Sequence, residues 1–169
     1  MRPNWQPYFL GIALEVAKRG TCLRRCYGAV LVGEDHAILS TGYCGAPRGV
    51  KNCCDTGVCP RDAAGCKSGE GYELCVSVHA EANALLSAGA ARTKGAMLYI
   101  AGFYAGETTR TDDRPIIVNS APCHFCKRLI RQAGVIRVVY FKGPDIAAID
   151  DVSLWSVEDF RGPRSERLS

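Results

Sequence analysis

Two motifs decide the expected fold of this chain: His79-Ala80-Glu81 and, further along, Pro122-Cys123-His124-Phe125-Cys126. Each is common on its own, because a His-x-Glu often lies on a helix surface and a Cys-x-x-Cys can be redox-active or structural. Together they supply an imidazole, two thiols and a carboxylate. We expect His79, Cys123 and Cys126 to bind Zn²⁺ with a fourth position left for water, and Glu81 to act as the catalytic base.

Both motifs are expected to begin a helix. Residues 79–86 are rich in Ala and Leu and are followed by Gly89, and residues 123–133 lie between Pro122 and Gly134. Backbone N–H groups without partners at a helix N-terminus favour thiolate over thiol, which suits a metal site. The pattern therefore places the candidate ligands and the carboxylate at two helix ends.

Helical and strand patterns alternate around these motifs. Apolar residues at helical spacing predict a helix over residues 5–17, followed by Gly20. Short β-rich runs predict strands over residues 29–32, 37–41, 96–100, 116–118 and 135–141. This alternation predicts one α/β domain spanning residues 1–169, with three layers (α/β/α) in which a central sheet lies between helices.

Three segments lack such periodicity. Residues 43–76 hold many Gly and Cys and predict a long Cys-rich loop that needs something to order it. Residues 102–114 predict a polar surface loop, within a polar insertion over about residues 102–119 that precedes the second motif. The chain from about residue 161 onward is polar and is expected to fray.

Composition and charge narrow the function classes. Hydrophobic residues make up 47% of the chain and charged residues 22%, as in an ordinary globular protein. The net charge of +4 suits a small anionic substrate but is too weak to indicate nucleic acid. The nearest basic cluster, Lys18-Arg19 with Arg24-Arg25, fits a solvated helix end at least as well.

Two further features of the sequence indicate the cellular compartment of the protein. The sequence starts without a signal peptide and has no apolar run that could span a membrane, so we expect a cytoplasmic protein that does not engage a membrane. The cytosol keeps thiols reduced, and the ten cysteines therefore favour metal binding over disulfides.

The chain resembles the cytidine and deoxycytidylate deaminase superfamily over about residues 21–141, and within it most closely the deoxycytidylate (dCMP) deaminase branch. Besides the two motifs above, the matching stretches are Thr21-Cys22-Leu23-Arg24-Arg25, Gly28-Ala29-Val30, Gly42-Tyr43-Cys44-Gly45-Ala46-Pro47-Arg48-Gly49, Glu73-Leu74-Cys75 and Ala133-Gly134-Val135. The resemblance implies a cytidine-deaminase-like fold with a five-stranded mixed sheet and a homo-oligomer. It also implies a zinc-dependent aminohydrolase, most simply one that converts dCMP to dUMP and ammonia.

The resemblance also suggests substrate contacts at Cys44, Arg48, Ala80 and Ser120. Family members commonly carry Asn at the position of Cys44, where its amide holds a sugar hydroxyl, and a thiol is a weaker hydrogen-bonding group. Arg48 is a candidate for a substrate phosphate, or else a solvated loop arginine. Ser120 lies where the family reads the base edge through backbone groups, or else is a helix cap. Cys44 and the insertion leave the identity of the substrate open.

The remaining cysteines suggest a second metal site. Some dCMP deaminases have a structural zinc in this region, and a Cys₄ site would order the Cys-rich loop. The positions that match the family best are Cys22, Cys53, Cys59 and Cys75, and Cys54 or Cys66 is an alternative for one of them. The other interpretation is a set of small buried residues or spare thiols.

Function is narrowed to a leading interpretation and several alternatives. The leading one is deamination of a free cytosine nucleotide, with a small nucleotide or nucleobase as partner. The enzyme alternative is another amino-heterocycle, such as a modified cytidine, guanine or a secondary metabolite, with Cys44 as its main support. A nucleic-acid editing deaminase is disfavoured because no basic stripe with interleaved aromatic residues is present. Glu81 disfavours a zinc-stabilised binding module, because a structural site has no use for a carboxylate beside the metal.

Overall fold

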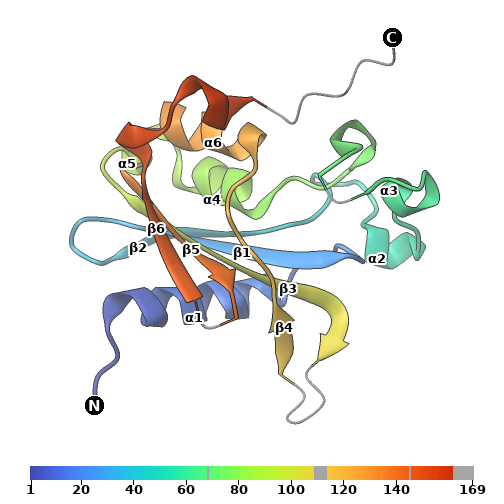
Figure 1. Cartoon of the computed structure of the whole chain (residues 1–169), viewed down its shortest axis with the longest axis horizontal. Helices are drawn as coiled ribbons and strands as arrows, with labels where there is room; N and C mark the ends of the chain where they lie inside the picture. The colour runs from blue at the N-terminus through green and yellow to red at the C-terminus, as the bar shows by residue number, and fades with distance from the viewer. Residues whose placement is uncertain (68, 109–113, 145, 162–169) are drawn as a thin grey trace.

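One mixed β-sheet forms the centre of the protein, seen in a computed structural model that describes residues 1–67, 69–108, 114–144 and 146–161 (Figure 1). Its strands are β1 (Arg25–Val32), β2 (Ile38–Tyr43), β3 (Met97–Thr108), β4 (Pro115–Ile117), β5 (Arg137–Gly143) and β6 (Ile146–Asp151). The strand order is β2-β1-β3-β5-β6, and β4 pairs with β3 at the side. β3 and β5 are parallel, whereas the other pairings are antiparallel.

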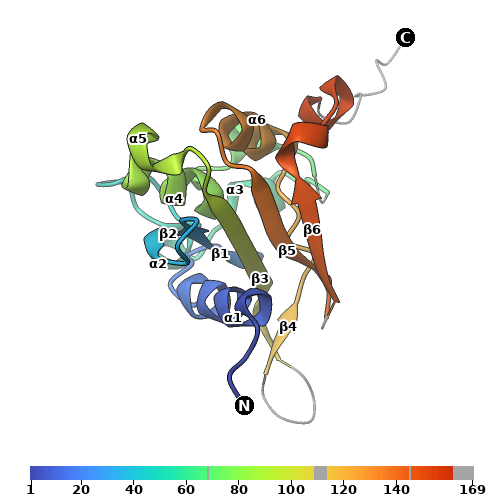
Figure 2. The same ribbon diagram turned by 90° about the vertical axis from the view of Figure 1, so that its left-hand side faces the viewer.

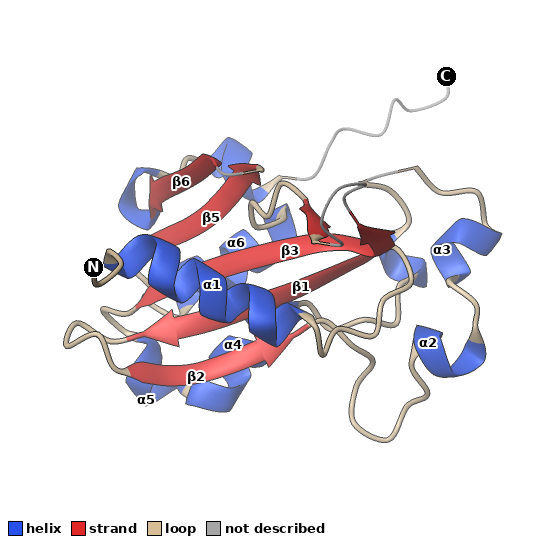
Figure 3. Ribbon diagram, turned by 90° about the horizontal axis from the view of Figure 1, so that it is seen from below, coloured by secondary structure: helices blue, strands red, loops and turns tan. Residues whose placement is uncertain are grey.

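Helices cover both faces of this sheet. The helix α1 (Trp5–Ala17) lies across one face, and α4 (Ala80–Ala88) and α6 (His124–Gln132) lie on the other (Figures 2 and 3). The shorter elements are α2 (Cys53–Thr56), α3 (Pro60–Ala63), α5 (Ala90–Thr93) and the 3₁₀ turns η1 (Tyr72–Leu74), η2 (Val152–Leu154) and η3 (Val157–Phe160). No helix in the described part of the chain is long and apolar enough to cross a bilayer.

The alternation of side chains along the central strands builds two cores. On β1, Val30 and Val32 point toward α1, where they pack with Phe9, Leu10 and other apolar side chains. Ala29 and Leu31 point the other way, into a cluster with Ala80 and Ala84 of α4 and Ile130 of α6. Because successive side chains of a strand face opposite sides, a continuous apolar run fits a strand buried on both faces.

The sequence-based prediction of the fold class is confirmed. The expected helix over residues 5–17 is α1, and the runs at 29–32, 37–41, 96–100, 116–118 and 135–141 each overlap a strand. The helices expected at 79–86 and 123–133 are α4 and α6, and the sheet is mixed and lies between helical layers as predicted.

Two local predictions differ from the structure. Residues 102–108, expected in a surface loop, continue β3, because β1 starts at Arg25 and supplies pairing partners as far as Tyr104, while Ile117 pairs with Phe103 from the other side. The sheet also gains a sixth strand, β6, which the apolar pattern did not reveal. Its side chains are mostly exposed, and backbone pairing with β5 holds it at the sheet edge.

The Cys-rich segment contains short helices rather than regular layers. α2, α3 and η1 lie in it, beside the end of the sheet where β1 begins (Figure 1). An isolated backbone bridge between Gly45 and Val78 closes the segment at its base. Part of the expected polar insertion, residues 109–113, and nearly all of the expected frayed tail, residues 162–169, lie outside the described residues.

Close packing of α4 against the sheet depends on Gly42 of β2. A Cβ atom at this position would overlap backbone atoms of Ala80 and Ala84, and backbone in a helix cannot move aside as a flexible side chain can. Glycine here therefore lets α4 lie close to the sheet, and this position places the first turn of α4 beside α6.

The Gly42→Ala variant should be destabilised by about 1–3 kcal/mol, because the added methyl group pushes α4 away from β2. Denaturant unfolding followed by circular dichroism measures this change. Gly11→Ala is the matched control: Gly11 is exposed on α1 with nothing within 4 Å of the new Cβ, and this variant should gain about 0.5–1 kcal/mol. Equal stability of the two variants would contradict the close-packing argument.

Candidate zinc centre and active site

The three candidate metal ligands come from the starts of two neighbouring helices. His79 directly precedes α4, Cys123 directly precedes α6, and Cys126 lies in the first turn of α6. Both helices pack on the same face of the sheet and touch each other. The fold thereby brings His79 next to two cysteines that follow it by 44 and 47 positions.

The spacing of the ligand atoms fits zinc. His79 Nδ1 lies 3.4 Å from Cys123 Sγ and 3.3 Å from Cys126 Sγ, and the three atoms lie within 4.8 Å of one another. A tetrahedral zinc ion with Zn–S of ~2.3 Å and Zn–N of ~2.0 Å places its ligand atoms about 3.5–3.8 Å apart. Among the described residues, this is the group of His, Cys and acidic side chains compact enough to hold a metal ion.

Mutual contacts set the protonation of these groups in the metal-free protein. Hydrogen bonds with Cys126 and with His79 lower the pKa of Cys123 to about 3, so this sulfur is a thiolate at neutral pH. Hydrogen bonding to Cys123 raises the pKa of His79 to about 9, and the same partner raises the pKa of Cys126 above its usual value. In the metal-free protein, the protons on His79 and Cys126 therefore take the place of the metal ion that would neutralise the two sulfurs.

Glu81 combines burial with closeness to the metal group. It lies in the first turn of α4, and only 6% of its surface is exposed. Burial raises its pKa, while the nearby charge of His79 acts in the opposite direction. A carboxyl group whose pKa moves up toward neutrality is suited to accept a proton and to give it back.

Glu81 and two of the metal ligands line one cavity. The empty space of this cavity is about 800 Å³ when the open solvent at its mouth is included. His79, Ala80, Glu81 and Cys123 form part of its lining. A ligand in the cavity would therefore meet His79, Cys123 and the buried carboxylate at once, with Cys126 buried behind them.

Comparison with known families agrees with this geometry. A family model described as the cytidine and deoxycytidylate deaminase zinc-binding region matches residues 3–142. The chain belongs to this deaminase family.

Two curated relatives illustrate how much of the chain is shared. The deoxycytidylate deaminase of Mycobacterium phage D29 is 40% identical over 146 residues, which cover 83% of this chain and 97% of the phage protein. That of Schizosaccharomyces pombe is 37% identical over 140 residues, which cover 82% of this chain but 37% of the yeast protein. The deaminase described here thus matches the phage protein over nearly its whole length and the yeast protein over little more than a third.

A solved structure shares the arrangement of the sheet and helices. The dCMP deaminase of cyanophage S-TIM5, solved in complex with dCMP and dUMP, superimposes with a TM-score of 0.52 at 25% identity. The match covers 83% of this chain and 82% of the cyanophage chain.

The structure places three of the four suggested substrate contacts at the cavity. Cys44, Ala80 and Ser120 all belong to its lining and are almost fully buried. Cys44 Sγ accepts a hydrogen bond from the Tyr27 backbone N–H at 3.2 Å, so its thiol is already engaged by the protein. Arg48 lies apart: it is exposed and is not among the described side chains that line the cavity.

Three other arginines line the cavity instead. Arg24 and Arg25 stand at the start of β1, and Arg61 lies on α3 in the Cys-rich segment. The Arg24-Arg25 pair therefore belongs to the site and not to a solvated helix end. Its position before a β-rich run was visible in the sequence, but Arg61 carried no comparable signal because its place depends on how the loop folds back.

Two of these arginines hold buried donors that have no partner. Arg24 Nε pairs with Asp62 Oδ1 at 3.1 Å, yet its Nη1 is buried without a hydrogen-bond partner among the described residues. Arg61 donates through Nη2 to the Lys67 carbonyl at 3.3 Å, and its buried Nε is likewise unpartnered within that part of the chain. Unpaired buried donors are costly and are satisfied by an acceptor that enters the cavity.

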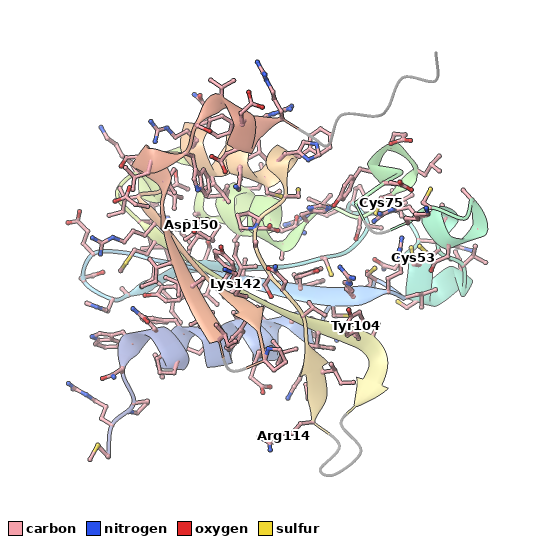
Figure 4. The ribbon with its side chains drawn as sticks, viewed as in Figure 1. Cys53, Cys75, Tyr104, Arg114, Lys142 and Asp150 are labelled. Atoms are coloured by element: carbon pink, nitrogen blue, oxygen red, sulfur yellow. The ribbon has the colours of Figure 1, made fainter. Side chains whose placement is uncertain are left out.

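The second group of cysteines lies in the Cys-rich segment and beside it. Cys53 begins α2, Cys59 precedes α3, Cys75 follows η1, and Cys22 lies just before β1. Burial raises the pKa of Cys53, and the charges of Cys59, Cys22 and Cys75 add to this rise. Figure 4 shows Cys53 and Cys75 in the same part of the molecule. The charges of the other three thiols reach Cys53, but among the described residues the four do not form a group as compact as His79, Cys123 and Cys126.

Zinc binding to the metal-free protein at pH 7 should release about two protons, one from His79 and one from Cys126, because Cys123 is already ionised. The affinity should rise between pH 7 and pH 9 as His79 loses its proton. Titration calorimetry in buffers of different ionisation enthalpy counts the protons.

The His124→Ala variant is the control, since it removes the imidazole of the second motif, which is not a candidate ligand, and leaves the ligand set intact. It should release the same number of protons as the unaltered protein, whereas His79→Ala should bind zinc more weakly and release fewer. Zinc binding without proton release would contradict these protonation states.

Proposed function

We propose that the protein is a zinc-dependent aminohydrolase that converts dCMP to dUMP and ammonia. The observation that carries this proposal is the buried carboxylate of Glu81, which lines one cavity with His79 and Cys123 of the three-ligand group that Cys126 completes. Three protein ligands and a base beside them are typical of a catalytic rather than a structural zinc site. Membership of the deaminase family and relatives named deoxycytidylate deaminase support the substrate.

The roles of the residues follow from their places in the cavity. His79, Cys123 and Cys126 would hold the zinc ion, which when bound lowers the pKa of a coordinated water toward ~7. Glu81 would accept a proton from that water and donate it to the ring nitrogen of cytosine. It would then take up the second proton of the attacking oxygen and pass it to the departing amine. Ala80 and Ser120, both buried in the lining, would limit where the base can lie.

The arginines of the cavity favour a substrate that carries a phosphate group. Arg24 and Arg61 both line the cavity, and each has a buried N–H donor without a partner among the described residues. Guanidinium groups are well suited to phosphate because their donors are arranged as a planar fork. The sequence suggests Arg48 for this role, whereas the cavity lining favours Arg24 and Arg61.

Cys44 favours a second candidate, a deaminase of another amino-heterocycle. Its thiol lines the cavity, and its hydrogen bond with Tyr27 leaves it poorly placed to hold a sugar hydroxyl. A site without that contact discriminates less strongly between sugars. A modified cytidine, guanine or a secondary metabolite would then be the substrate, and a panel of amino-heterocycles separates this candidate from the first.

The zinc-loaded protein should release ammonia from dCMP, and the Glu81→Gln variant should lose at least about a thousandfold in kcat, because the amide cannot carry the proton. Coupled ammonia detection measures the rate, and metal analysis checks that the variant keeps its catalytic zinc. Turnover by Glu81→Gln at the rate of the unaltered protein would refute the assigned role. Activity on another amino-heterocycle but not on dCMP would select the second candidate.

A second, structural zinc at Cys22, Cys53, Cys59 and Cys75 is the other part of the proposal. The four thiols come from three short elements and the approach to β1, and their charges influence one another. The segment that holds them has no apolar core of its own among the described residues, since the two core clusters lie on the sheet. A metal ion would hold such a segment in place of a core. Cys54 or Cys66 would replace one ligand in an alternative set.

Metal analysis of the pure protein should give about two zinc ions per chain, and Cys53→Ser should lower this to about one while it lowers the midpoint of thermal unfolding. Cys54→Ser is the matched control, because Cys54 is the exposed neighbour of Cys53 and should not change the ratio. A ratio of one in the unaltered protein would remove the second site. Loss of zinc from Cys54→Ser would exchange the two ligands.

We also propose a cytoplasmic homo-oligomer. All ten cysteines are unpaired thiols, which suits a reducing compartment. Large apolar side chains are exposed toward the C-terminal end, among them Ile149, Leu154 and Val157. A second copy of the chain would cover this surface.

A further inference from the structure

Tyr72 lies between the metal group and an arginine of the cavity. It begins the 3₁₀ turn η1 and follows Gly71, whose positive φ of 64° directs the chain back toward the sheet. The side chain is half-buried and belongs to the cavity lining. It is the aromatic residue that the Cys-rich segment contributes to the site.

One side of the Tyr72 ring faces the zinc centre. Its centroid lies 5.8 Å from the ring of His79 and 6.0 Å from each of the rings of His124 and Phe125 on α6. Burial raises the pKa of the Tyr72 hydroxyl, and the charge of Cys123 adds to the rise. The ring therefore packs against a metal ligand and against the helix that carries the other two.

The other contact of the ring is with Arg61. The guanidinium carbon lies 4.8 Å from the ring centroid, a cation–π contact. Apart from this contact, the described partners of Arg61 are limited to the Lys67 carbonyl, and the buried Nε donor remains unpaired. Asp62, the neighbouring acid, pairs with Arg24 instead. The position of the Arg61 guanidinium thus depends mainly on Tyr72.

We propose that Tyr72 is a positioning residue that makes deamination depend on the phosphate group of the substrate. The inference rests on the proposed function and goes beyond it. Tyr72 holds the Arg61 guanidinium in the cavity, where its free N–H group donates a hydrogen bond to a phosphate oxygen. Arg61 held by phosphate in turn keeps the Tyr72 ring against His79, beside the base.

The energetic consequence is a preference for the nucleotide over the nucleoside. A substrate without phosphate leaves the buried Nε of Arg61 unpaired and leaves the Tyr72 ring without its second anchor. Binding energy from the remote phosphate then improves the placement of the base at the metal centre. Loss of the ring should therefore lower the preference for dCMP over deoxycytidine rather than affect both substrates alike.

The test measures kcat/KM for dCMP and for deoxycytidine with the zinc-loaded protein. The Tyr72→Leu variant should lower the dCMP-to-deoxycytidine ratio about tenfold, mainly through a higher KM for dCMP, whereas Tyr72→Phe, which keeps the ring, should stay within about threefold of the unaltered ratio. The matched control is Tyr8→Leu, the same substitution at a half-exposed tyrosine of α1 on the opposite face of the sheet. It should leave the ratio unchanged.

The Arg61→Met variant tests whether Tyr72 acts through Arg61 or only by shaping the wall of the cavity. It should lower the same ratio by at least about tenfold, and the double variant Arg61→Met/Tyr72→Leu should lower it no further, because both changes remove one contact. Multiplying effects would show that Tyr72 acts independently of Arg61 and would overturn the proposal. A normal ratio in Arg61→Met would overturn it as well, even if Tyr72→Leu failed to fold or to hold zinc.

Two failures remain distinguishable. If the unaltered protein shows no activity on dCMP, the proposed function fails and the inference falls with it. If the unaltered protein prefers dCMP but Tyr72→Leu lowers kcat/KM for both substrates by the same factor, the function stands and the role of Tyr72 is wrong.

Discussion

The site depends on two helix N-termini that converge over one face of the sheet. His79 precedes α4 and Cys123 precedes α6, and a metal ion can join them only if the two helix starts lie within a few ångströms. Gly42 of β2 helps to satisfy this constraint, because the backbone of α4 lies so close to it that there is no room for a Cβ atom. The parallel pairing of β3 and β5 also contributes, because it sets the distance between the strands on which α4 and α6 pack.

The same convergence explains the electrostatics of the cavity. Helix N-termini favour negative charge, and here a thiolate at Cys123 and a carboxyl at Glu81 lie at two of them. Burial works against both charges, and the pKa of Glu81 is accordingly raised. A bound divalent cation would balance the thiolate, which leaves Glu81 free to exchange a proton.

What could be predicted from the sequence is what local patterns encode. His79, Glu81, Cys123 and Cys126 lie at the starts of two helices. Pro122 marks in the sequence where the second helix begins, Gly89 and Gly134 mark where the helices end, and the buried strands carry continuous apolar runs. The strand β6 escaped prediction because its side chains are exposed and its backbone pairing leaves no apolar pattern. Arg61 and Tyr72 escaped for another reason: their place in the cavity depends on long-range contacts of an irregular segment, which no periodicity reports.

The Cys-rich segment therefore has a larger role than its lack of regular structure suggests. It supplies Arg61 and Tyr72 to the cavity, and polar contacts tie it to β1 and to the residue before β1. These contacts include the pair between Arg24 and Asp62 and the hydrogen bond from the Tyr27 N–H to Cys44 Sγ. Whatever orders this segment also places its arginine and its aromatic ring. The catalytic chemistry rests on the rigid helix starts, and the choice of substrate rests on the segment that has no core of its own. Substitutions in the segment can therefore change specificity without change to the zinc ligands, because the two depend on different parts of the fold.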